Sequence, residues 1–402
     1  LESEDVLKTA NAMSALGAKV IQNKSGFWSI KGVGVGGLKE PEDVIYCGNS
    51  GTSVRLLMGV VATCSIKVTF TGDDSLRNRP MNRVVLPLTE FGTSFSTNFD
   101  NKLPINVIGS ENSIPIRYEL PVPSAQVKSA ILLAGLNARG RTTVIERENT
   151  RDHTEKMLKA FGANVIIENT EQISKISIDG FPNLRPIEIN VPGDISSAAF
   201  PIAAACIVEG SDIVIRGVGV NPLRDGFLDT LIEMGANIKI KNIRQNAGEP
   251  VADIAVTYSP NLKGIEVPEH RSTRMIDEYP VLSMVASTAN GPTVMKGVEE
   301  LRYKESDRIK AIAKGLIDNG IEVTEKKNMF IVNGNGPKSI KGGSIIDASN
   351  DHRIAMSFAC LGLTSENGIK VTGADSIYTS FPNFIDLMNS LGSLMIVSKI
   401  EI

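Results

Sequence analysis

A short motif that ends a helix recurs six times along the chain. Its copies are MSALGAKV, LTEFGTSF, LKAFGANV, LIEMGANI, LIDNGIEV and MNSLGSLM. The glycines of these copies, which lie 70 to 85 residues apart, are Gly17, Gly92, Gly162, Gly235, Gly320 and Gly392. A single helix–glycine–strand unit is common in α/β proteins, but six copies at near-regular spacing predict a chain built from repeats.

Each copy has a direct physical interpretation. Apolar residues precede the glycine at helical spacing, as Val6, Ala10 and Met13 do before Gly17. Glycine then ends the helix, because it adopts the left-handed backbone conformation without a steric clash at Cβ. We expect a strand after every glycine, as in ANIKIKN, where isoleucines alternate with lysines.

A second recurring feature is a turn rich in Ser, Thr, Asp and Gly that leads into a helix of small apolar residues. It precedes the helix-ending glycine by about 40 residues. Its five copies are GNSGTSVRLLMG, PSAQVKSAILLAG, GDISSAAFPIAAA, IDEYPVLSMVA and SNDHRIAMSFACLG. The partner of Gly17 would lie roughly 20 to 26 positions before Leu1. We therefore expect the chain to begin in the middle of its first repeat.

Six repeats divide most simply into two domains of three. A chain of 402 residues is too long for one ordinary core. The division falls between the closing strands of the third repeat and GDISSAAF, near Val191–Pro192. We therefore expect an α/β protein with one domain over residues 1–191 and another over residues 192–402.

Composition and charge narrow the class of function. The formal net charge is -3 and the basic residues are dispersed, which argues against nucleic acid as a partner. No apolar run approaches the roughly 18 residues that cross a bilayer, and no signal peptide is visible. We therefore expect a cytoplasmic protein that does not bind membranes.

Cysteine and histidine usage argues against a metal site. The four cysteines have no CxxC spacing, so we expect them to be reduced and buried. The three histidines are not in an HxxxH or HExxH arrangement. The sequence therefore predicts no structural zinc.

The five turns are candidates for anion binding, because helix N-termini carry unpaired N–H groups and partial positive charge. In the first half they are rich in hydroxyl and amide groups, and in the second half they carry Asp194, Asp277, Glu278 and Asp351. Each turn by itself is explained by ordinary helix capping. Five repeated turns beside arginines and lysines favour transfer of a phosphorylated group to a hydroxyl.

Three segments make the pattern specific. GNSGTSVRL followed by SLRNRPM, then LRYKESDRI, then NDHRIAM resemble in order and separation the motifs of the EPSP synthase family. The similarity runs from residue 1 to about residue 397. Details such as SAQVKSAILLAGLN and TRDHTEKML point to the bacterial subgroup that includes glyphosate-tolerant members.

This resemblance implies two similar domains, each an inside-out α/β barrel of three βαβαββ units, closing on the cleft between them. It also implies a reaction in which the 5-hydroxyl of shikimate 3-phosphate attacks C2 of phosphoenolpyruvate and phosphate is then lost. The family uses no metal and no organic cofactor. We expect a monomer that binds these two small molecules and the inhibitor glyphosate.

Matching the family motifs residue by residue assigns roles to this chain. For phosphoenolpyruvate the matching residues are Gly51, Arg79, Gln126, Arg308 and Arg353. For shikimate 3-phosphate they are Ser124, Gln126, Arg151, Asp277 and Lys304. Structural alternatives stay open, because Arg308 is placed to form a surface pair with Glu305 and Ser124 to cap a helix.

The resemblance also identifies candidate catalytic groups. Asp277 is expected to deprotonate the 5-hydroxyl, and Glu305 is the best remaining candidate for protonation of C3. The alternative for Asp277 is a capping role at the helix that contains Val281–Val285. We interpret His352 as a structural residue of a helix start rather than as an acid or base.

Three departures from the family bear on activity. The Lys-Ser pair and arginine of the family's first helix start are absent, so we expect this polypeptide alone to be weakly active or inactive. Thr379 stands where some members have lysine, a feature that the tolerant subgroup shares. Gly51 stands where highly tolerant relatives have alanine, so we expect greater sensitivity to glyphosate.

Two competing interpretations remain. One is the enolpyruvyl transferase that acts on UDP-N-acetylglucosamine, which uses a reactive cysteine, and Cys64 is the residue nearest a plausible position. The other is that the polypeptide is a non-catalytic fragment.

Overall fold

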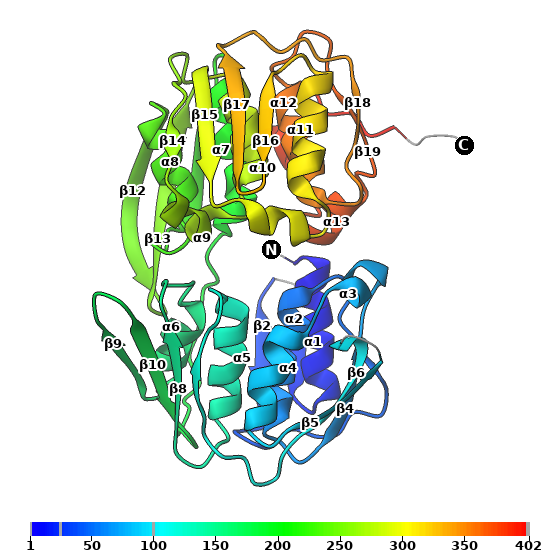
Figure 1. Cartoon of the computed structure of the whole chain (residues 1–402), viewed down its shortest axis with the longest axis vertical. Helices are drawn as coiled ribbons and strands as arrows, with labels where there is room; N and C mark the ends of the chain where they lie inside the picture. Colours follow the sequence, from blue (N-terminus) through cyan, green and yellow to red (C-terminus); the bar gives the residue numbers. More distant parts are fainter. Residues whose placement is uncertain (1, 24–25, 99–100, 399–402) are drawn as a thin grey trace. The chain divides into compact units, whose positions relative to one another are not determined.

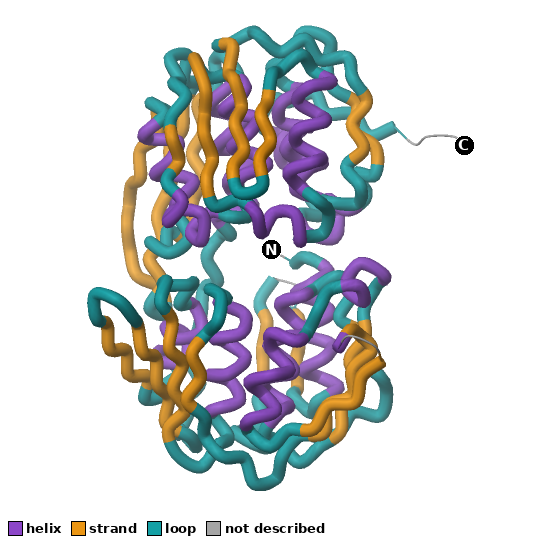
Figure 2. The backbone as a smooth tube through the Cα atoms, viewed as in Figure 1, coloured by secondary structure: helices purple, strands orange, loops and turns teal. Residues whose placement is uncertain are grey.

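The computed structural model describes residues 2–23, 26–98 and 101–398 (Figure 1). By its internal contacts the chain separates into an N-terminal unit, Glu2–Ile189, and a C-terminal unit, Asn190–Ile402. In each unit, strands flank a group of helices (Figure 2).

The six motif glycines end six helices, as the sequence predicts. Every one of these helices stops two residues before its glycine: α1 (Glu4–Ala15), α4 (Asn82–Glu90), α6 (His153–Ala160), α8 (Gly226–Glu233), α11 (Arg308–Asp318) and α14 (Phe384–Ser390). The glycines have φ angles between 84° and 104°. Behind Gly17 the Ala18 N–H donates to the carbonyl of Met13, which satisfies a helix-end carbonyl in the way a left-handed glycine allows.

The five polar turns also lead into helices, as predicted. These helices are α2 (Gly51–Ala62), α5 (Ala125–Gly135), α7 (Ile195–Ile207), α10 (Tyr279–Ser287) and α12 (His352–Gly362). In the C-terminal unit α7, α10 and α12 pack on one another, and in the N-terminal unit α2 packs on α5. Every residue of α10 is buried, so this helix carries no solvent face and belongs to the core.

Three sheets share one topology. The first two strands of each are parallel, and an antiparallel hairpin completes the sheet. One has the order β3-β4-β6-β5, from β3 (Ile45–Tyr46), β4 (Lys67–Thr71), β5 (Ser94–Asn98) and β6 (Lys102–Ile108). The second has the order β7-β8-β10-β9, from β7 (Arg117–Glu119), β8 (Arg141–Glu146), β9 (Val165–Asn169) and β10 (Ser174–Asp179). The third has the order β14-β15-β17-β16, from β14 (Glu266–Val267), β15 (Asn290–Lys296), β16 (Val323–Lys326) and β17 (Met329–Asn335).

The remaining sheets contain parts of the same pattern. The first is the hairpin of β1 (Lys19–Gln22) and β2 (Trp28–Lys31). The next has the order β11-β13-β12, from β11 (Asp212–Gly219), β12 (Asn237–Asn246) and β13 (Glu249–Thr257), and a parallel bridge from Gly193 to Val218 takes the place of a first strand. The last is the parallel pair β18 (Ile345–Asp347) and β19 (Lys370–Thr372).

The expectation of a strand after every motif glycine is wrong at Gly392. Residues 393–398 form no strand, whereas the five earlier glycines are all followed by one. In those five repeats the strand pairs with a hairpin partner, but the sheet β18-β19 has no such hairpin among the residues described. Without a hydrogen-bonding partner a strand does not form. Leu394 and Ile396 are each 89% exposed as a result.

The four cysteines are buried and unpaired with one another, as expected. Within the described part of the chain, no helix has both the length and the apolar character required to cross a bilayer.

The contact between α2 and α5 is unusually close at Gly59. A Cβ atom at this position would lie 2.3 Å from the carbonyl oxygen of Ala130 and 2.6 Å from its Cα. Both obstacles are backbone atoms of a neighbouring helix, so they cannot move aside as a flexible side chain does. The two helices that begin at polar turns of the N-terminal unit are therefore fixed to each other by a glycine.

We predict that Gly59→Ala lowers the free energy of unfolding by roughly 1–3 kcal/mol, because the added methyl group forces the two helices apart. The matched control is Gly362→Ala, where a new Cβ atom meets nothing nearer than 3.4 Å at the end of α12. Urea unfolding followed by circular dichroism measures both. Equal stability of the two variants would contradict the close contact.

Candidate active site

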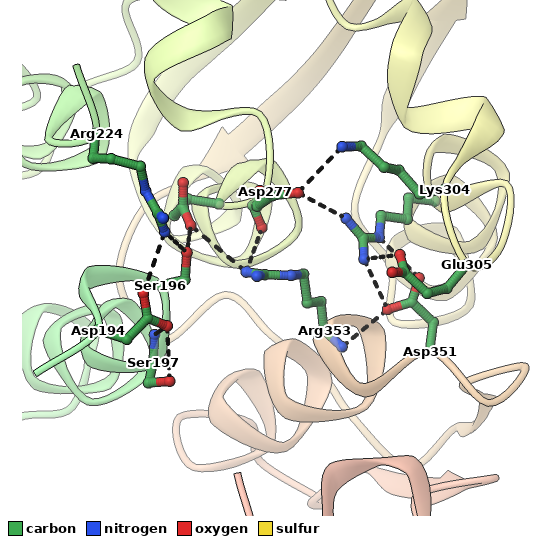
Figure 3. A network of polar contacts seen from close by, with 11 residues as sticks. Asp194, Ser196, Ser197, Arg224, Asp277, Lys304, Glu305, Asp351 and Arg353 are labelled. Atoms are coloured by element: carbon green, nitrogen blue, oxygen red, sulfur yellow. Dashed lines mark hydrogen bonds and ion pairs between the residues drawn. The ribbon is translucent and has the colours of Figure 1, made fainter. Parts of the chain in front are cut away.

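Side chains from three helix starts of the C-terminal unit meet around Arg308, the first residue of α11. Figure 3 shows Asp277, Lys304, Glu305, Asp351 and Arg353 of this group. We call this group the arginine–carboxylate cluster and define it as Asp277, Lys304, Glu305, Arg308, Asp351 and Arg353. The cluster contains five of the ten residues that the family resemblance assigns to the site. Asp351 was expected only as a carboxylate at a helix start.

The Arg308 guanidinium is buried, with 1% of its surface exposed. Its Nε donates to Asp351 Oδ2 at 2.8 Å, and its Nη1 lies 3.4 Å from Asp277 Oδ1. Its Nη2 pairs with Glu305. The predicted pair of Arg308 with Glu305 exists, but it is not the surface salt bridge of the structural alternative, because the arginine lies in the interior.

Asp351 links the two arginines of the cluster. As the N-cap residue of α12, it accepts a hydrogen bond from the Arg353 backbone N–H at 3.0 Å. The same carboxylate accepts from Arg308 and from the Ser306 hydroxyl, and it is completely buried. One carboxylate therefore positions both the start of α12 and the guanidinium of α11.

Asp277 faces the cations rather than the helix that follows it. Lys304 Nζ lies 3.3 Å and Arg308 Nη1 3.4 Å from its Oδ1 atom. The N-cap residue of α10 is Glu278, and its side chain makes no capping bond. The alternative of a capping role for Asp277 is therefore wrong.

The Arg353 side chain extends toward Asp277, which precedes the start of α10 (Figure 3). Its Nη1 donates to the backbone carbonyl of Asp277 at 3.0 Å and is 3.6 Å from Glu278 Oε1. Glu278 is buried and accepts from the Ser196 hydroxyl, which in turn accepts from Arg224 Nη2 at 2.6 Å. The guanidinium of Arg353 is thus oriented by two adjacent residues at the start of α10, and Glu278 is itself bonded to Ser196 of α7.

The electrostatics keep the cluster charged. Burial alone would lower the pKa of Arg308, but the carboxylates of Asp351, Glu305 and Asp277 raise it. Burial would raise the pKa of Asp351, and the Arg308 guanidinium lowers it below its usual range. Burial and the charge of Arg353 lower the pKa of His352, so this imidazole is neutral near pH 7.

A second group of predicted residues lies in the N-terminal unit. We call it the helix-start cluster and define it as Asn49, Gly51, Thr52, Arg55, Arg79 and Gln126. Arg55 Nη1 donates to Gln126 Oε1 at 2.9 Å, and Gln126 Nε2 donates to Thr52 Oγ1 at 2.8 Å. These bonds join the start of α2 to the start of α5.

Gly51 faces two guanidinium groups of this cluster. A Cβ atom at Gly51 would lie 2.7 Å from Arg55 Nη1 and 3.2 Å from Arg79 Nη1. Arg79 follows the short helix α3 (Asp74–Asn78), and its Nη2 donates to Asn49 Oδ1 at 2.5 Å. The absence of a side chain at residue 51 thus leaves room for two cations at the N-terminus of α2.

Ser124 is the N-cap residue of α5, two residues before Gln126, and Arg151 directly precedes Asp152, the N-cap residue of α6. The Ser124 hydroxyl accepts from the Val127 N–H at 3.3 Å, so its capping role is confirmed. Arg151 lies in the turn between β8 and α6, and its neighbour Thr150 contacts α5 through Lys128.

Sequence reasoning missed two arginines: Arg55, which belongs to the helix-start cluster, and Arg224, which contacts Asp194 and Ser196 beside the arginine–carboxylate cluster. Arg55 lies four residues after Gly51 in a helix, so helical spacing alone would have placed it on the same face. Arg224 follows β11 in a segment without a motif, and only the fold brings it to Ser196 and Asp194. No local signal predicts that contact.

His352 gives a testable consequence of these charges. Because its pKa is lower in the folded protein than its ordinary value of about 6.5, the unfolded chain binds the extra proton. The free energy of unfolding therefore has its full contribution from neutral His352 above about pH 6.5, and it decreases as the pH falls below 6.5. Asp351 adds a loss only at still lower pH, because its own pKa is lowered.

We predict that His352→Gln makes the melting temperature less sensitive to pH between pH 7 and pH 5 than it is in the parent. His270→Gln, in the exposed part of the 3-10 helix Glu269–Arg271, is the control and should leave the parent's pH dependence unchanged. Scanning calorimetry across this range measures all three proteins. An unchanged slope in His352→Gln would show that the partly buried imidazole is not responsible.

Known proteins match this chain over almost its whole length. The family model described as EPSP synthase (3-phosphoshikimate 1-carboxyvinyltransferase) matches residues 1–388. A 3-phosphoshikimate 1-carboxyvinyltransferase of Ruegeria sp. (strain TM1040) is 54% identical over 396 residues, which cover 98% of this chain and 88% of that protein. One of Jannaschia sp. (strain CCS1) is 55% identical over 393 residues, with 98% and 87% covered.

Solved structures show the same fold. The EPSP synthase of Acinetobacter baumannii superposes with a TM-score of 0.88 at 44% identity, covering 99% of this chain and 90% of that one. The enolpyruvyl transferase NikO of Streptomyces tendae gives a TM-score of 0.75 at 16% identity, covering 98% and 88%, which shows likeness of fold alone. The predicted α/β class is confirmed by these matches. The chain therefore belongs to the EPSP synthase family, the 3-phosphoshikimate 1-carboxyvinyltransferases of aromatic amino acid biosynthesis.

Proposed function

We propose that this chain transfers the enolpyruvyl group of phosphoenolpyruvate to the 5-hydroxyl of shikimate 3-phosphate, forming 5-enolpyruvylshikimate 3-phosphate and phosphate. The observation that carries the proposal is the buried Arg308 guanidinium, oriented by three carboxylates beside Arg353 and Lys304. A buried, oriented guanidinium suits a planar carboxylate, because its N–H groups bond two oxygens at once. The family membership supports the choice of substrates.

Arg308 and Arg353 are proposed to bind the carboxylate of phosphoenolpyruvate. Both guanidinium groups are oriented by protein oxygens before a ligand binds. Arg79, Gln126 and the backbone at Gly51 are proposed to bind its phosphate. A glycine at a helix N-terminus lets an anion approach the N–H groups closely.

Shikimate 3-phosphate is proposed to bind through Ser124, Gln126, Arg151, Asp277 and Lys304. The phosphate would be bound by Ser124, Gln126 and Arg151, which belong to α5 and the adjoining turn. Arg55 is a further candidate for the anion sites, since it donates to Gln126. Lys304 and Asp277, paired at 3.3 Å, would bind the hydroxyl side of the same substrate.

Asp277 and Glu305 are proposed as the acid–base groups. The oxygen of the 5-hydroxyl bonds to C2 of phosphoenolpyruvate while Asp277 takes the hydroxyl proton. Glu305 supplies a proton to C3. In the tetrahedral adduct, loss of a proton from C3 and departure of phosphate from C2 then restore the double bond. Both carboxylates contact Arg308, so the same cation is placed to orient the two reacting groups and the donor substrate.

The finer architecture is proposed on the same basis. The repeated strand–helix–strand–helix–hairpin order supports two inside-out α/β barrel domains, over residues 1–191 and 192–402. We further propose a cytoplasmic monomer. The rival reaction on UDP-N-acetylglucosamine requires a reactive cysteine, but burial of Cys64 raises the pKa of its thiol, which argues against that role.

Arg308→Lys tests the proposal. We predict that this variant weakens phosphoenolpyruvate binding by at least ~10-fold, because an ammonium group cannot pair with the carboxylate through two N–H groups. Affinity for shikimate 3-phosphate should change little. Calorimetry measures both constants whatever the rate of turnover, and release of inorganic phosphate measures turnover.

The matched control is Arg302→Lys, six residues earlier, where the arginine pairs with Glu325 and Asp307 outside the cluster. It should bind both ligands like the parent. Failure of the parent to bind either substrate would contradict the proposed function. The turnover of the parent also decides whether the expectation of low activity holds.

Gly51→Ala tests the role of the helix-start cluster. The new methyl group would press on Arg55 and Arg79 at 2.7 Å and 3.2 Å, so both guanidinium groups must shift. We predict weaker inhibition by glyphosate and a smaller loss of phosphoenolpyruvate affinity, in an assay of phosphate release or in competition calorimetry. Undiminished inhibition would contradict this assignment of Gly51.

A further inference from the structure

A second group of charges, separate from the arginine–carboxylate cluster, is buried in the N-terminal unit. Lys128 Nζ lies 2.7 Å from Glu155 Oε1 and 3.2 Å from Glu146 Oε1. The exposed fractions of these side chains are 1% for the lysine, 2% for Glu155 and 4% for Glu146. Three elements supply them: α5, the end of β8 and α6.

The group is centred on the backbone of Thr150. Lys128 Nζ donates to the Thr150 carbonyl at 3.2 Å. Glu146 accepts from the Thr150 N–H at 3.2 Å and from its hydroxyl at 2.9 Å. A residue in a turn therefore has its carbonyl, its N–H and its side chain all bonded to buried charged groups.

The position of this turn connects it to the proposed substrate site. Thr150 directly precedes Arg151, a proposed ligand of the shikimate phosphate. Lys128 lies on α5 one helical turn after Ser124 and two residues after Gln126, the other two proposed ligands of that phosphate. Beyond the turn, the hydroxyls of Ser129 and Thr154 are 2.7 Å apart and join α5 to α6 again.

Stability alone is a poor explanation for such a group. Removing three charges from water is expensive, and well-packed apolar residues often stabilise a core as well as a buried ion pair does. The group is also unbalanced, with two carboxylates and one ammonium, and burial raises the pKa of Glu155. The group instead orients the backbone of the turn, because charged hydrogen bonds to the Thr150 N–H and carbonyl restrict both its distance and its angle.

We propose that Lys128 is a positioning residue for Arg151, with Glu146 and Glu155 as its anchors. Through the Thr150 carbonyl it fixes the turn after β8 to α5, so that Ser124, Gln126 and Arg151 form one rigid set of groups for a phosphate monoester. This inference rests on the proposed function, in which these three residues bind shikimate 3-phosphate.

The test uses Lys128→Met in the full chain, which removes the ammonium but keeps most of the side-chain volume. We expect affinity for shikimate 3-phosphate to fall by ~10-fold or more, with phosphoenolpyruvate affinity much less affected, in titration calorimetry. Lys128→Met leaves the buried carboxylates of Glu146 and Glu155 without their cation, which can destabilise the fold. Thr150→Val therefore serves as a milder second variant. It removes one bond to Glu146 and should shift the same constant in the same direction, by less.

The matched control is Thr63→Val. The Thr63 hydroxyl donates to the Ala134 carbonyl at the other end of α5, so its loss weakens the same helix without touching the turn. It should lower the melting temperature but leave both dissociation constants unchanged. If Thr63→Val weakens shikimate 3-phosphate binding as much as Thr150→Val does, the effect is general destabilisation and the proposal is wrong.

Hydrogen–deuterium exchange gives a readout that does not depend on the ligand. In Lys128→Met or Thr150→Val, the peptide over residues 147–153 should exchange at least ~10-fold faster than in the parent, while Thr63→Val should leave it unchanged. A turn that stays as protected in both variants would overturn the positioning role, even if the parent binds substrate. A parent that binds no shikimate 3-phosphate, with the turn loosened as expected, would instead count against the proposed function.

Discussion

The candidate site depends on a guanidinium that is buried together with its counter-charges. Arg308 lies in the interior, and Asp351 beneath it is completely buried. Burying either charge alone would carry a large desolvation penalty, which their pairing offsets. Arg308 also bonds Asp277 and Glu305, and Asp351 also accepts from Ser306. The arrangement holds a positive charge in a defined orientation before any ligand arrives, which is what recognition of a small anion requires.

The repeat architecture explains why these groups lie together. Each repeat brings a polar helix start to an equivalent place, and α7, α10 and α12 pack on one another in the C-terminal unit. Asp194, Glu278 and Asp351 are the N-cap residues of these three helices. Carboxylates at neighbouring helix starts would repel one another, but each is paired with an arginine: Asp194 with Arg224, Asp351 with Arg308 and Glu278 with Arg353. Figure 3 shows Arg224 beside Asp194 and Arg353 beside Asp351. The carboxylates at these helix starts therefore orient the arginines that we propose as substrate ligands.

Much of the fold could be predicted from the sequence, because its signals are local. Glycine after an amphipathic helix has one favoured conformation, and all six motif glycines adopt it. The site residues of the C-terminal unit lie in short motifs, so their convergence around Arg308 followed from the family pattern. The strand expected after Gly392 failed, since strand formation depends on a partner that no local pattern reveals. Arg224 and Lys128 were missed for the same reason, because their partners are distant in the sequence. Arg224 contacts Ser196, 28 residues away, and Lys128 contacts Glu146, 18 residues away.

We propose that Asp351 serves substrate binding by orienting Arg308, and a double-mutant cycle on phosphoenolpyruvate affinity can decide whether it does. The four proteins are the parent, Arg308→Lys, Asp351→Asn and the double variant, titrated in the presence of shikimate 3-phosphate. If the two residues act as one unit, the losses will be strongly non-additive, with a coupling free energy above about 1 kcal/mol. Losses that add within about 0.3–0.5 kcal/mol would show that the two residues act independently and would contradict the account.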